Sequence, residues 1–293
     1  MIDFKERPMN EKLNSILKIL KYDKVSMVYS YNFENIDQED EIQLRENFAN
    51  ENYQDYLETI AACHSISVMD AEVARFINAL PFEGVIIDVG GGWGWHWRNL
   101  SSIRPDLSVV VVDFCKNNFT HAKNILKNEI NKTIFLVHGD ATNLIFDENI
   151  FDGYWTVQAL QHIPNFQKCI EEAYRVLKPG GTFANYSLNN QCPIKLLYSI
   201  FRKDYVIEGY VNGLFYLSRA SNKQAIIIEK IFNRKVEKRY TEILFKPELG
   251  LSKLGRVAFM GNIDSKLSNI GFLFSYIARQ CSFHVIKSNK DSI

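Results

Sequence analysis

The sequence predicts an α/β protein whose mostly parallel β-sheet is covered by helices on both faces. Between Val85 and Leu188, short apolar segments alternate with amphipathic segments. In a strand with one solvent-exposed face, apolar and polar residues alternate. The apolar segments lack this alternation, so both of their faces should be buried. Parallel strands separated by helices are joined by right-handed crossovers, and the sheet is then covered on both sides.

Five strands are expected in this central region, each rich in apolar and β-branched residues. They are predicted at residues 85–89, 108–114, 133–140, 151–157 and 182–188. A helix through Arg98 and Leu100 should follow the first strand. Two further helices are predicted at 116–130 and 166–177, where apolar residues recur at helical spacing.

The N-terminal residues 1–80 are predicted to form a helical cap over the sheet. The apolar residues of 13–20 share one helical face, and 68–80 repeats that pattern. The aromatic segment 48–61 between them is also expected to be helical. Pro81 and Gly84 should end the last of these helices.

Residues 81–293 are predicted to be the ligand-binding domain, with an elaborated C-terminal third that belongs to the same compact unit. A helix is expected at 223–232, and another between 246 and 280. The segment 236–245 alternates enough to be a strand. The segment 281–288 is its expected antiparallel partner.

Charge and cysteine content restrict the partners of the chain. It has 34 Lys and Arg and 34 Asp and Glu, so its formal net charge is zero and it has no long-range field for nucleic acid or an anionic membrane. We therefore expect neither as a partner. The five cysteines form no C-x-x-C pair, and the odd number suits a reducing compartment. A cytoplasmic protein without a metal site is expected, and its oligomeric state stays open.

A glycine-rich turn follows the first predicted strand, in the segment from Asp88 to Gly94 (DVGGGWG). Open α/β sheets bind ligands at the carboxyl ends of their strands, where the amides of such a turn point into the crevice. Glycine lets a ligand lie against the backbone because it has no Cβ. A glycine-rich turn alone is weak evidence for a ligand site, and it becomes stronger when suitable polar residues follow the neighbouring strands.

Two acidic residues end the next two strands. Asp113 can accept hydrogen bonds from the hydroxyls of a ribose, and Phe114 beside it offers a flat apolar face to a purine. Asp140, followed by Ala141, can accept a hydrogen bond from the exocyclic amine of adenine. Alone, each acidic residue could cap a helix or close a turn. Together, at successive strand ends, they predict an adenosine site.

The residues around the turn favour an adenosine ligand that carries an amino acid over one that carries phosphates. A dinucleotide site needs a third glycine for close packing of helix and strand, but Trp95 or Trp97 stands at that position. A P-loop needs Lys followed by Ser or Thr, which is missing here. Asp88 would repel a pyrophosphate and attract an ammonium group.

From about Val68 to Leu188 the sequence resembles the class I S-adenosylmethionine-dependent methyltransferases, which have a Rossmann-like fold. The motifs that carry the resemblance are D-x-G-x-G-x-G at 88–94, Asp113, Gly139-Asp140-Ala141, Phe151-Asp152, the segment 158–162 and RVLKPGG at 175–181. The last motif is typical of the small-molecule branch. The resemblance implies a seven-stranded sheet whose last strand is antiparallel, with S-adenosylmethionine as the cofactor.

The resemblance also implies roles for individual residues. Gly90 and Gly92, with Gly91 between them, would line the methionine portion of the cofactor. Asp88 would order the turn and face the amino group, and Gln158 would lie beside the sulfonium. For the adenosine portion it implies the same residues as the local reasoning: Asp113 for the ribose, and Asp140 and Ala141 for adenine.

The implied activity is methyl transfer to the O, N or C atom of a small organic acceptor. We assign no catalytic residue, because a histidine at the position of His162 recurs in relatives with different chemistry. The three tryptophans Trp93, Trp95 and Trp97 are unusually bulky for this turn and are expected to pack under the cap. A cation-π contact of one indole with the sulfonium is the alternative.

Two other functions remain open from the sequence. The same crevice could serve a nucleotide- or NAD-dependent enzyme. It could also belong to a non-catalytic module that keeps the cofactor pocket without turnover. The aromatic segment 198–216, with Tyr53 and Tyr56, is expected to build an apolar lid for a small acceptor.

Overall fold

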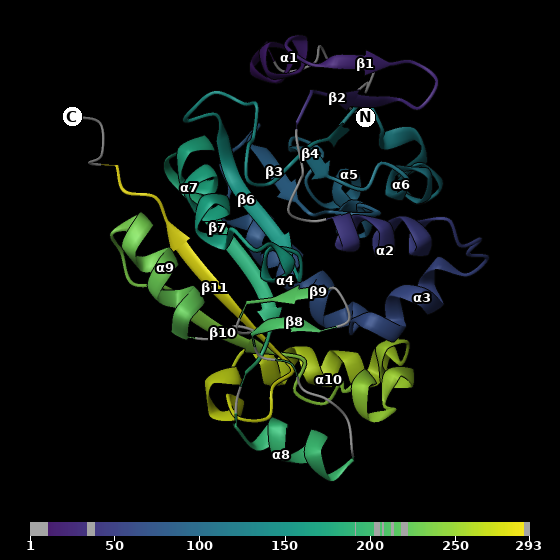
Figure 1. Cartoon of the computed structure of the whole chain (residues 1–293), viewed down its shortest axis with the longest axis vertical. Helices are drawn as coiled ribbons and strands as arrows, with labels where there is room; N and C mark the ends of the chain where they lie inside the picture. Colours follow the sequence, from purple (N-terminus) through teal and green to yellow (C-terminus); the bar gives the residue numbers. More distant parts are fainter. Residues whose placement is uncertain are drawn as a thin grey trace.

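The computed structural model describes residues 11–33, 39–190, 192–201, 206, 208–211, 214–217 and 222–289. Its main element is a nine-stranded sheet with the strand order β1-β2-β5-β4-β3-β6-β7-β11-β10 (Figure 1). The strands of this sheet are β1 (Lys21–Asp23), β2 (Val28–Ser30), β3 (Val85–Val89), β4 (Ser108–Asp113), β5 (Ile134–His138), β6 (Phe151–Val157), β7 (Leu177–Leu188), β10 (Glu237–Thr241) and β11 (Gln280–Ile286).

The five central strands are parallel and confirm the predicted α/β class. Every residue of β3 is buried, and so is every residue of β4 after Ser108. Alternate residues of β3 face opposite layers: Ile87 belongs to one apolar cluster and Ile86 to the other. Burial on both faces explains why these strands lack polar alternation.

Helices cover both faces of the sheet, as the sequence predicts. On one face pack α1 (Glu11–Lys18), α7 (Phe166–Val176) and α9 (Asn222–Phe232). On the other face pack α4 (Ile66–Asn78), α5 (Leu100–Ile103) and α6 (Asn118–Leu126). The remaining helices are α2 (Glu39–Ala49), α3 (Tyr56–Cys63), α8 (Cys192–Ile200) and α10 (Ala258–Ser268).

The predicted helical cap over residues 1–80 is wrong in two respects. Residues 21–30 form the hairpin β1–β2, which extends the sheet by pairing β2 in parallel with β5, so the sheet has nine strands instead of seven. Helices α1 and α4 pack on the sheet itself. Only α2 and α3 lie over the carboxyl ends of the strands, and residues 50–55, which belong to the segment expected to be helical, form no helix.

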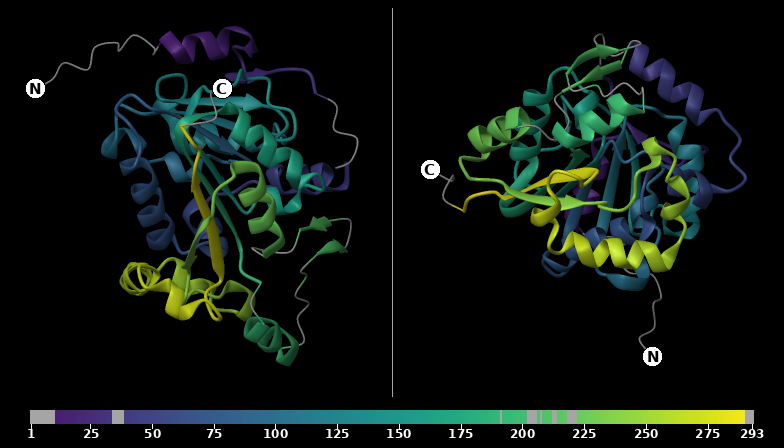
Figure 2. Two further views of the ribbon diagram at one scale, coloured as in Figure 1. Left: turned by 90° about the vertical axis from the view of Figure 1, so that its left-hand side faces the viewer. Right: turned by 90° about the horizontal axis from the view of Figure 1, so that it is seen from below.

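The C-terminal third completes the sheet and adds small elements at one end of the molecule. Strand β11 pairs antiparallel with both β7 and β10, which confirms the predicted antiparallel pair. The separate hairpin of β8 (Gly209–Val211) and β9 (Leu214–Tyr216) lies on the opposite side of the molecule from α10 (Figure 2) and contacts α2 and His162. Within the described ranges, no helix has the length and apolar character needed to cross a membrane.

A buried ion pair connects three elements below the cavity. Glu72 of α4 is 2% exposed, and its carboxylate accepts hydrogen bonds from Arg239 Nη2 at 2.8 Å and from the Tyr186 hydroxyl at 2.9 Å. Although burial opposes ionisation, the contacts with Arg239 lower the pKa of Glu72. The pair ties α4 to β10 and β7, and therefore holds the C-terminal third onto the central sheet.

We predict that Arg239→Met lowers the free energy of unfolding by about 3–5 kcal/mol, because it removes the hydrogen-bonded cation of the buried Glu72 and leaves only the longer contact with Arg75, at 3.7 Å. Urea unfolding at neutral pH measures this loss. The control is Lys235→Met, which removes an ion pair with Glu229 whose lysine is 90% exposed. That change should cost about 0–1 kcal/mol. Equal losses for the two variants would contradict the role of the buried pair.

Candidate functional site

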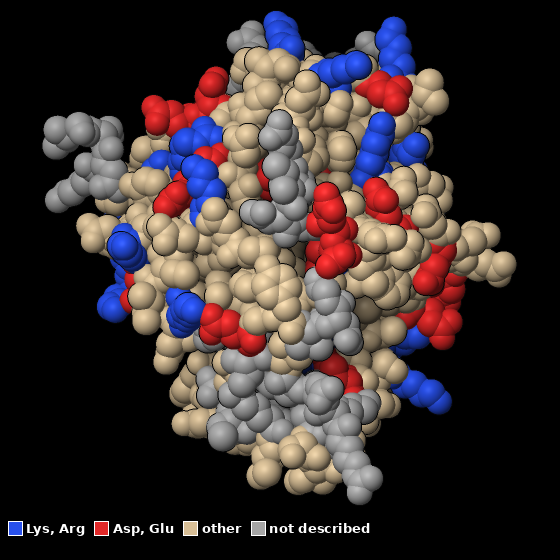
Figure 3. Space-filling view, viewed as in Figure 1, with Lys and Arg blue, Asp and Glu red and all other residues tan. Residues whose placement is uncertain are grey.

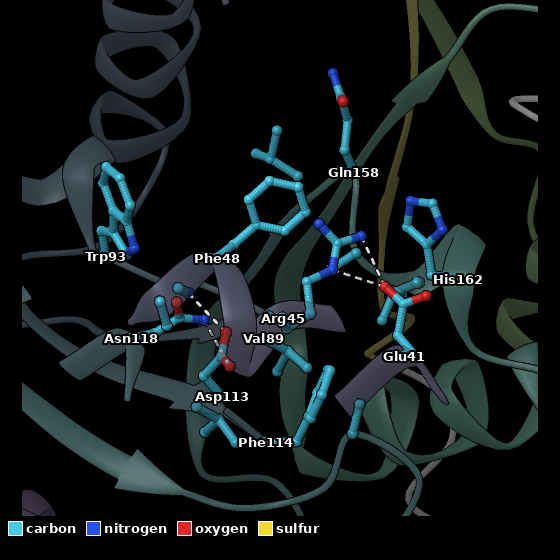
Figure 4. A pocket seen from close by; sticks show the side chains of 18 of the residues that line it. Glu41, Arg45, Phe48, Val89, Trp93, Asp113, Phe114, Asn118, Gln158 and His162 are labelled. Atoms are coloured by element: carbon cyan, nitrogen blue, oxygen red, sulfur yellow. Dashed lines mark hydrogen bonds and ion pairs between the residues drawn. The ribbon is translucent and has the colours of Figure 1, made fainter. Parts of the chain in front are cut away.

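A cavity of about 510 Å³ lies at the carboxyl ends of β3, β4, β5 and β6. Its volume is within the range of about 300–1,000 Å³ that is usual for ligand pockets. Its lining comes from the strand ends on one side and from α2 and α3 on the other (Figure 4). Of the residues predicted from the sequence, those that line it are Gly90, Gly92, Asp113, Phe114, Asp140, Ala141 and Gln158.

Two glycines of the turn have left-handed backbone conformations, with φ of 71° at Gly90 and 53° at Gly92. A Cβ at Gly90 would overlap the side chain of Ala159. A Cβ at Gly92 would meet no atom closer than 3.9 Å, because it would project into the cavity toward Asp113. Gly92 therefore keeps open a space that any side chain would fill.

Asp88 and Gly91 belong to the turn but do not line the cavity. The Asp88 carboxylate is buried directly beneath Gly91, where it accepts a hydrogen bond from Trp97 Nε1 at 2.7 Å. Burial raises the pKa of Asp88 to about 7, and the nearby Asp113 carboxylate adds to this shift. In this geometry the carboxylate orders the turn and does not face the cavity, contrary to the expected contact with an amino group.

Asp113 links the turn to the next strand. One carboxylate oxygen accepts a hydrogen bond from the backbone N–H of Gly92 at 2.8 Å. The other accepts hydrogen bonds from the backbone N–H of Cys115 at 2.8 Å and from Asn118 Nδ2 at 3.2 Å. Burial raises the pKa of Asp113, while the amide hydrogen bonds oppose this shift. A carboxylate offers about four acceptor positions, so about one remains for a ligand hydroxyl.

Asp140 lines the cavity, but its carboxylate is used within its own turn. Its two oxygens accept hydrogen bonds from the backbone amide of Thr142 at 2.9 Å and from the hydroxyl of Thr142 at 2.6 Å. The hydroxyl of Tyr31 accepts the Asp140 amide at 2.9 Å. Tyr31 follows β2, so the N-terminal hairpin fixes this part of the cavity wall.

Gln158 directly follows β6 with a left-handed backbone, φ 52°, and lines the cavity. Its backbone N–H donates a hydrogen bond to the Tyr186 carbonyl at 2.7 Å. Its side-chain Nε2 is buried and has no acceptor among the described residues. A buried donor without a partner is costly, so a ligand that supplies an acceptor would be favoured here.

His162 lines the cavity with both ring nitrogens in contact with protein atoms. Nδ1 lies 3.2 Å from the Phe215 carbonyl, and Nε2 lies 3.2 Å from Gln161 Nε2. Since a carbonyl can only accept, Nδ1 carries the proton and Nε2 accepts from Gln161. These contacts support a structural role, and we still assign no catalytic residue.

Sequence reasoning missed the polar pair that α2 contributes. Arg45 Nε donates to Glu41 Oε1 at 2.7 Å, and the second carboxylate oxygen of Glu41 is buried without a partner in the described part of the chain. Both side chains line the cavity (Figure 4). The available signal was the spacing of four residues between opposite charges, which usually marks a solvated helix face.

The three tryptophans of the turn differ in their surroundings. Trp93 lines the cavity and packs against Tyr53 of the cap, with ring centroids 4.7 Å apart. Trp95 instead stacks on the guanidinium of Arg98. Trp97 is fully buried, and its indole N–H donates a hydrogen bond to Asp88. The predicted packing under the N-terminal residues therefore holds for Trp93, and Trp97 lies in the same apolar cluster as Met69 and Val73 of α4.

Residues 87–185 match a family model described as a methyltransferase domain. This region includes the glycine turn, Asp113, Asp140 and Gln158. The chain carries a class I S-adenosylmethionine-dependent methyltransferase domain. The cofactor of this domain is S-adenosylmethionine.

Several curated relatives of the methyltransferase domain are similar over part of the chain. They include the sterol 24-C-methyltransferase of Kluyveromyces lactis, 32% identical over 40% of this chain and 33% of that protein. The malonyl-[acyl-carrier protein] O-methyltransferase of Buchnera aphidicola is 38% identical over 34% of this chain and 38% of its own length. The ubiquinone/menaquinone biosynthesis C-methyltransferase UbiE of Bartonella henselae is 27% identical over 57% of this chain and 66% of its own length. The chain thus spans about a third of the length of the first two.

Solved structures share the fold of the methyltransferase domain at low sequence identity. A SAM-dependent methyltransferase from Thermotoga maritima superposes with a TM-score of 0.52, 17% identity and coverage of 84% of this chain and 99% of its own. The [4+2]-cyclase SpnF superposes with a TM-score of 0.54 and 14% identity, and the match covers 76% of this chain and 80% of SpnF. A cyclase among the neighbours means that the fold alone does not determine the reaction.

We predict that Gly92→Ala abolishes measurable binding of S-adenosylhomocysteine, because its Cβ would enter the cavity. Isothermal titration calorimetry measures the affinity. The matched control is Gly250→Ala, at φ 82°, where an added Cβ would have no atom within 4 Å and would lie away from the cavity. Both variants should lose about 1–2 kcal/mol of stability through left-handed strain. Retained binding by Gly92→Ala would contradict the assignment.

We predict that Asp88→Asn flattens the pH dependence of stability. The folded carboxyl keeps its proton up to about pH 7, whereas the unfolded one releases it near the ordinary pKa of 3.8. The stability that this group contributes is therefore fully present below pH 3.8 and is lost as the pH rises through about 7. Asn cannot ionise and still offers Trp97 an acceptor.

Urea unfolding of wild type and Asp88→Asn across that pH interval checks this prediction. The wild type should lose more free energy of unfolding than the variant as the pH rises. Asp147→Asn, at an exposed position, is the control and should follow the wild type. Parallel curves for Asp88→Asn and the wild type would show that Asp88 does not cause the dependence.

Proposed function

We propose that this chain transfers a methyl group from S-adenosylmethionine to a small organic acceptor, at an O, N or C atom. The observation that carries the proposal is the arrangement of Gly92 and Asp113 at one end of the cavity. The glycine leaves the cavity open beside a buried carboxylate that keeps an acceptor position. This suits a ribose hydroxyl.

The lining residues fit the parts of S-adenosylmethionine. Asp113 would accept a ribose hydroxyl, Phe114 and Ala141 would enclose the adenine, and Gly90 would pass beside the methionine portion. The unpartnered Gln158 Nε2 would donate to an acceptor atom of that portion. Bound S-adenosylmethionine supplies an electrophilic methyl group.

The same residues argue against a dinucleotide or a nucleoside triphosphate. The Trp97 indole fills the space where the third glycine of a dinucleotide site lets helix and strand approach. None of the described lining residues is a lysine, and the arginine among them, Arg45, is already paired with Glu41. A pyrophosphate would thus have no available cation in the described part of the lining.

For methyl transfer the protein must mainly align the donor with the acceptor and exclude water. Such positioning contributes up to about 7–11 kcal/mol of barrier lowering. The wall opposite the strand ends carries the apolar side chains of Phe48, Tyr53 and Ile60 beside the charged pair Glu41–Arg45. These side chains would exclude water around the reacting atoms, and the cap would select the acceptor.

Partners and location are part of the same proposal. The relatives named above act on sterols, on quinone precursors and on a malonyl group carried by a protein, so an acceptor with an apolar portion agrees with the lining. The zero net charge favours no nucleic acid partner. The four described cysteines are free thiols, which suits the reducing cytoplasm.

We predict that Asp113→Asn weakens S-adenosylhomocysteine binding by about 10- to 100-fold, the loss of a charged hydrogen bond of about 1.5–3 kcal/mol. Calorimetric titration measures the change. The control is Asp152→Asn, since Asp152 also accepts a backbone amide, that of Val85 at 2.9 Å, but lies outside the cavity. It should bind like the wild type.

The proposal fails if the wild type binds neither S-adenosylmethionine nor S-adenosylhomocysteine while NAD or ATP raises its melting temperature. A second measurement addresses turnover: formation of S-adenosylhomocysteine in the presence of fractionated metabolite extracts. Tight cofactor binding without product in any fraction would favour a non-catalytic binding module.

A further inference from the structure

The carboxylate of Glu41 has one oxygen without a donor in the described part of the chain. Glu41 lies in the first turn of α2 and is 4% exposed. Arg45 Nε and Nη2 both contact Oε1, each at 2.7 Å, whereas Oε2 is buried and has no hydrogen-bond partner among the described residues. A buried acceptor without a donor is costly, so this oxygen favours a ligand that carries an N–H or O–H group.

Glu41 lies at the end of the cavity where the purine of the proposed cofactor would bind. It lines the same cavity as Asp113 and Phe114. In Figure 4 the labelled side chains of Asp113, Phe114 and Glu41 follow one another across the cavity, with Phe114 in the middle. A ligand whose ribose binds Asp113 and whose purine lies on Phe114 therefore directs the far edge of the purine toward Glu41.

The charge of the Glu41–Arg45 pair limits the kind of donor that suits this oxygen. One carboxylate and one guanidinium at 2.7 Å form a pair without net charge. An ammonium group gains little from such a pair, because the guanidinium repels it while the carboxylate attracts it. A neutral N–H or O–H donor needs only the lone pairs of Oε2.

The outer surface does not select a charged ligand either. Acidic and basic side chains occur together over the described part of the face seen in Figure 3. A surface of mixed sign produces no strong field that would draw a cation or an anion toward the cavity. Ligand selection therefore depends on individual side chains inside the cavity.

S-adenosylmethionine carries three kinds of hydrogen-bond donor, and two of them have other places in the cavity. The ribose hydroxyls would lie beside Asp113, and the ammonium group belongs to the methionine portion, beside Gly90 and Gln158. The remaining donor is the 6-amino group of adenine. This group is a neutral N–H donor at the far edge of the purine, as Glu41 requires.

Asp140, at the end of β5, is the other acidic residue on this side of the cavity. Its two oxygens accept hydrogen bonds from the backbone N–H and the hydroxyl of Thr142, at 2.9 and 2.6 Å. Both oxygens of Asp140 therefore have a donor within their own turn. Glu41 Oε2 has none in the described ranges, so a ligand amine satisfies Glu41 at the greater gain.

We propose that Glu41 binds the 6-amino group of adenine and makes the site selective for adenine over a 6-oxopurine. This role rests on the proposed function and assigns recognition of the base to the cap helix α2. The edge of adenine offers an acceptor nitrogen beside its amino group. Arg45 places N–H donors next to Glu41 Oε2, so the pair presents an acceptor and donors side by side, complementary to that edge.

S-inosylhomocysteine tests the proposal, because it has a carbonyl oxygen in place of the 6-amino group of S-adenosylhomocysteine. In the wild type this oxygen would face the Glu41 carboxylate, and neither group could donate a hydrogen bond to the other. The wild type should therefore bind S-adenosylhomocysteine at least about tenfold more tightly than S-inosylhomocysteine. Isothermal titration calorimetry at neutral pH measures both affinities.

Glu41→Gln should reduce this preference at least about fivefold, because the amide of Gln can accept from an amino group or donate to a carbonyl oxygen. The variant should also bind S-inosylhomocysteine more tightly than the wild type does, a gain that a misfolded protein cannot show. The matched control is Glu46→Gln on the same helix. Glu46 is exposed and lies outside the cavity lining, so this variant should keep the wild-type preference.

Equal affinity of the wild type for the two compounds would overturn the proposal, and so would an unchanged preference in Glu41→Gln. In either case S-adenosylhomocysteine still binds, and the proposed methyl transfer stands. If Asp140→Asn removes the preference and Glu41→Gln does not, the amino group binds Asp140 and the proposal is wrong. Binding of neither compound by the wild type would contradict the proposed function and this role of Glu41 together.

Discussion

The hydrogen bond from Trp97 Nε1 to the buried carboxylate of Asp88 fixes the floor of the cavity. It joins the end of β3 to the first helical turn after the glycines, at 2.7 Å. Gly91 lies directly over this carboxylate, which leaves no room for a side chain there. The path of the turn, and with it the open space at Gly92, depends on this contact.

The roof of the cavity depends on a different set of contacts, centred on His121 of α6. Its Nε2 lies 2.7 Å from the Ala49 carbonyl at the end of α2, and its Nδ1 lies 3.2 Å from the Tyr56 hydroxyl at the start of α3. A single buried imidazole therefore holds both cap helices over the strand ends. Because the cap carries Phe48, Tyr53 and Ile60, it would determine which acceptor fits.

The C-terminal third also supports the cavity from outside. Glu242 is fully buried and accepts the Ser65 amide at 2.8 Å and Arg279 Nη1 at 2.7 Å. Burial opposes its ionisation, but the charge of Arg279 lowers the pKa of Glu242. This pair fixes the chain next to His64, a residue of the cavity wall. The N-terminal residue Ser65 and the C-terminal residues Glu242 and Arg279 thus meet behind the part of the cavity lining that contains His64.

The amino-acid pattern was sufficient to predict the central sheet and the strand ends at which the cavity lies. The strands at 85–89 and 151–157 are found with the bounds predicted, because burial on both faces demands continuous apolar residues and leaves a clear pattern. The placement of Asp113 next to the glycine turn also follows from the parallel order, since adjacent strand ends meet at one edge. These features depend on local pattern and on topology rules.

The remaining features arise from contacts between distant parts of the chain and could not be predicted. The hairpin β1–β2 is too short to leave a periodic signal, and it is stabilised by pairing with β5, more than a hundred residues away in the chain. The direction of the Asp88 side chain depends on Trp97, and the exposure of the apolar residues Leu196 and Ile200 of α8 depends on which elements pack against that helix. An apolar stripe looks the same in a sequence whether it faces a core or solvent, because periodicity records the spacing of side chains and not their partners.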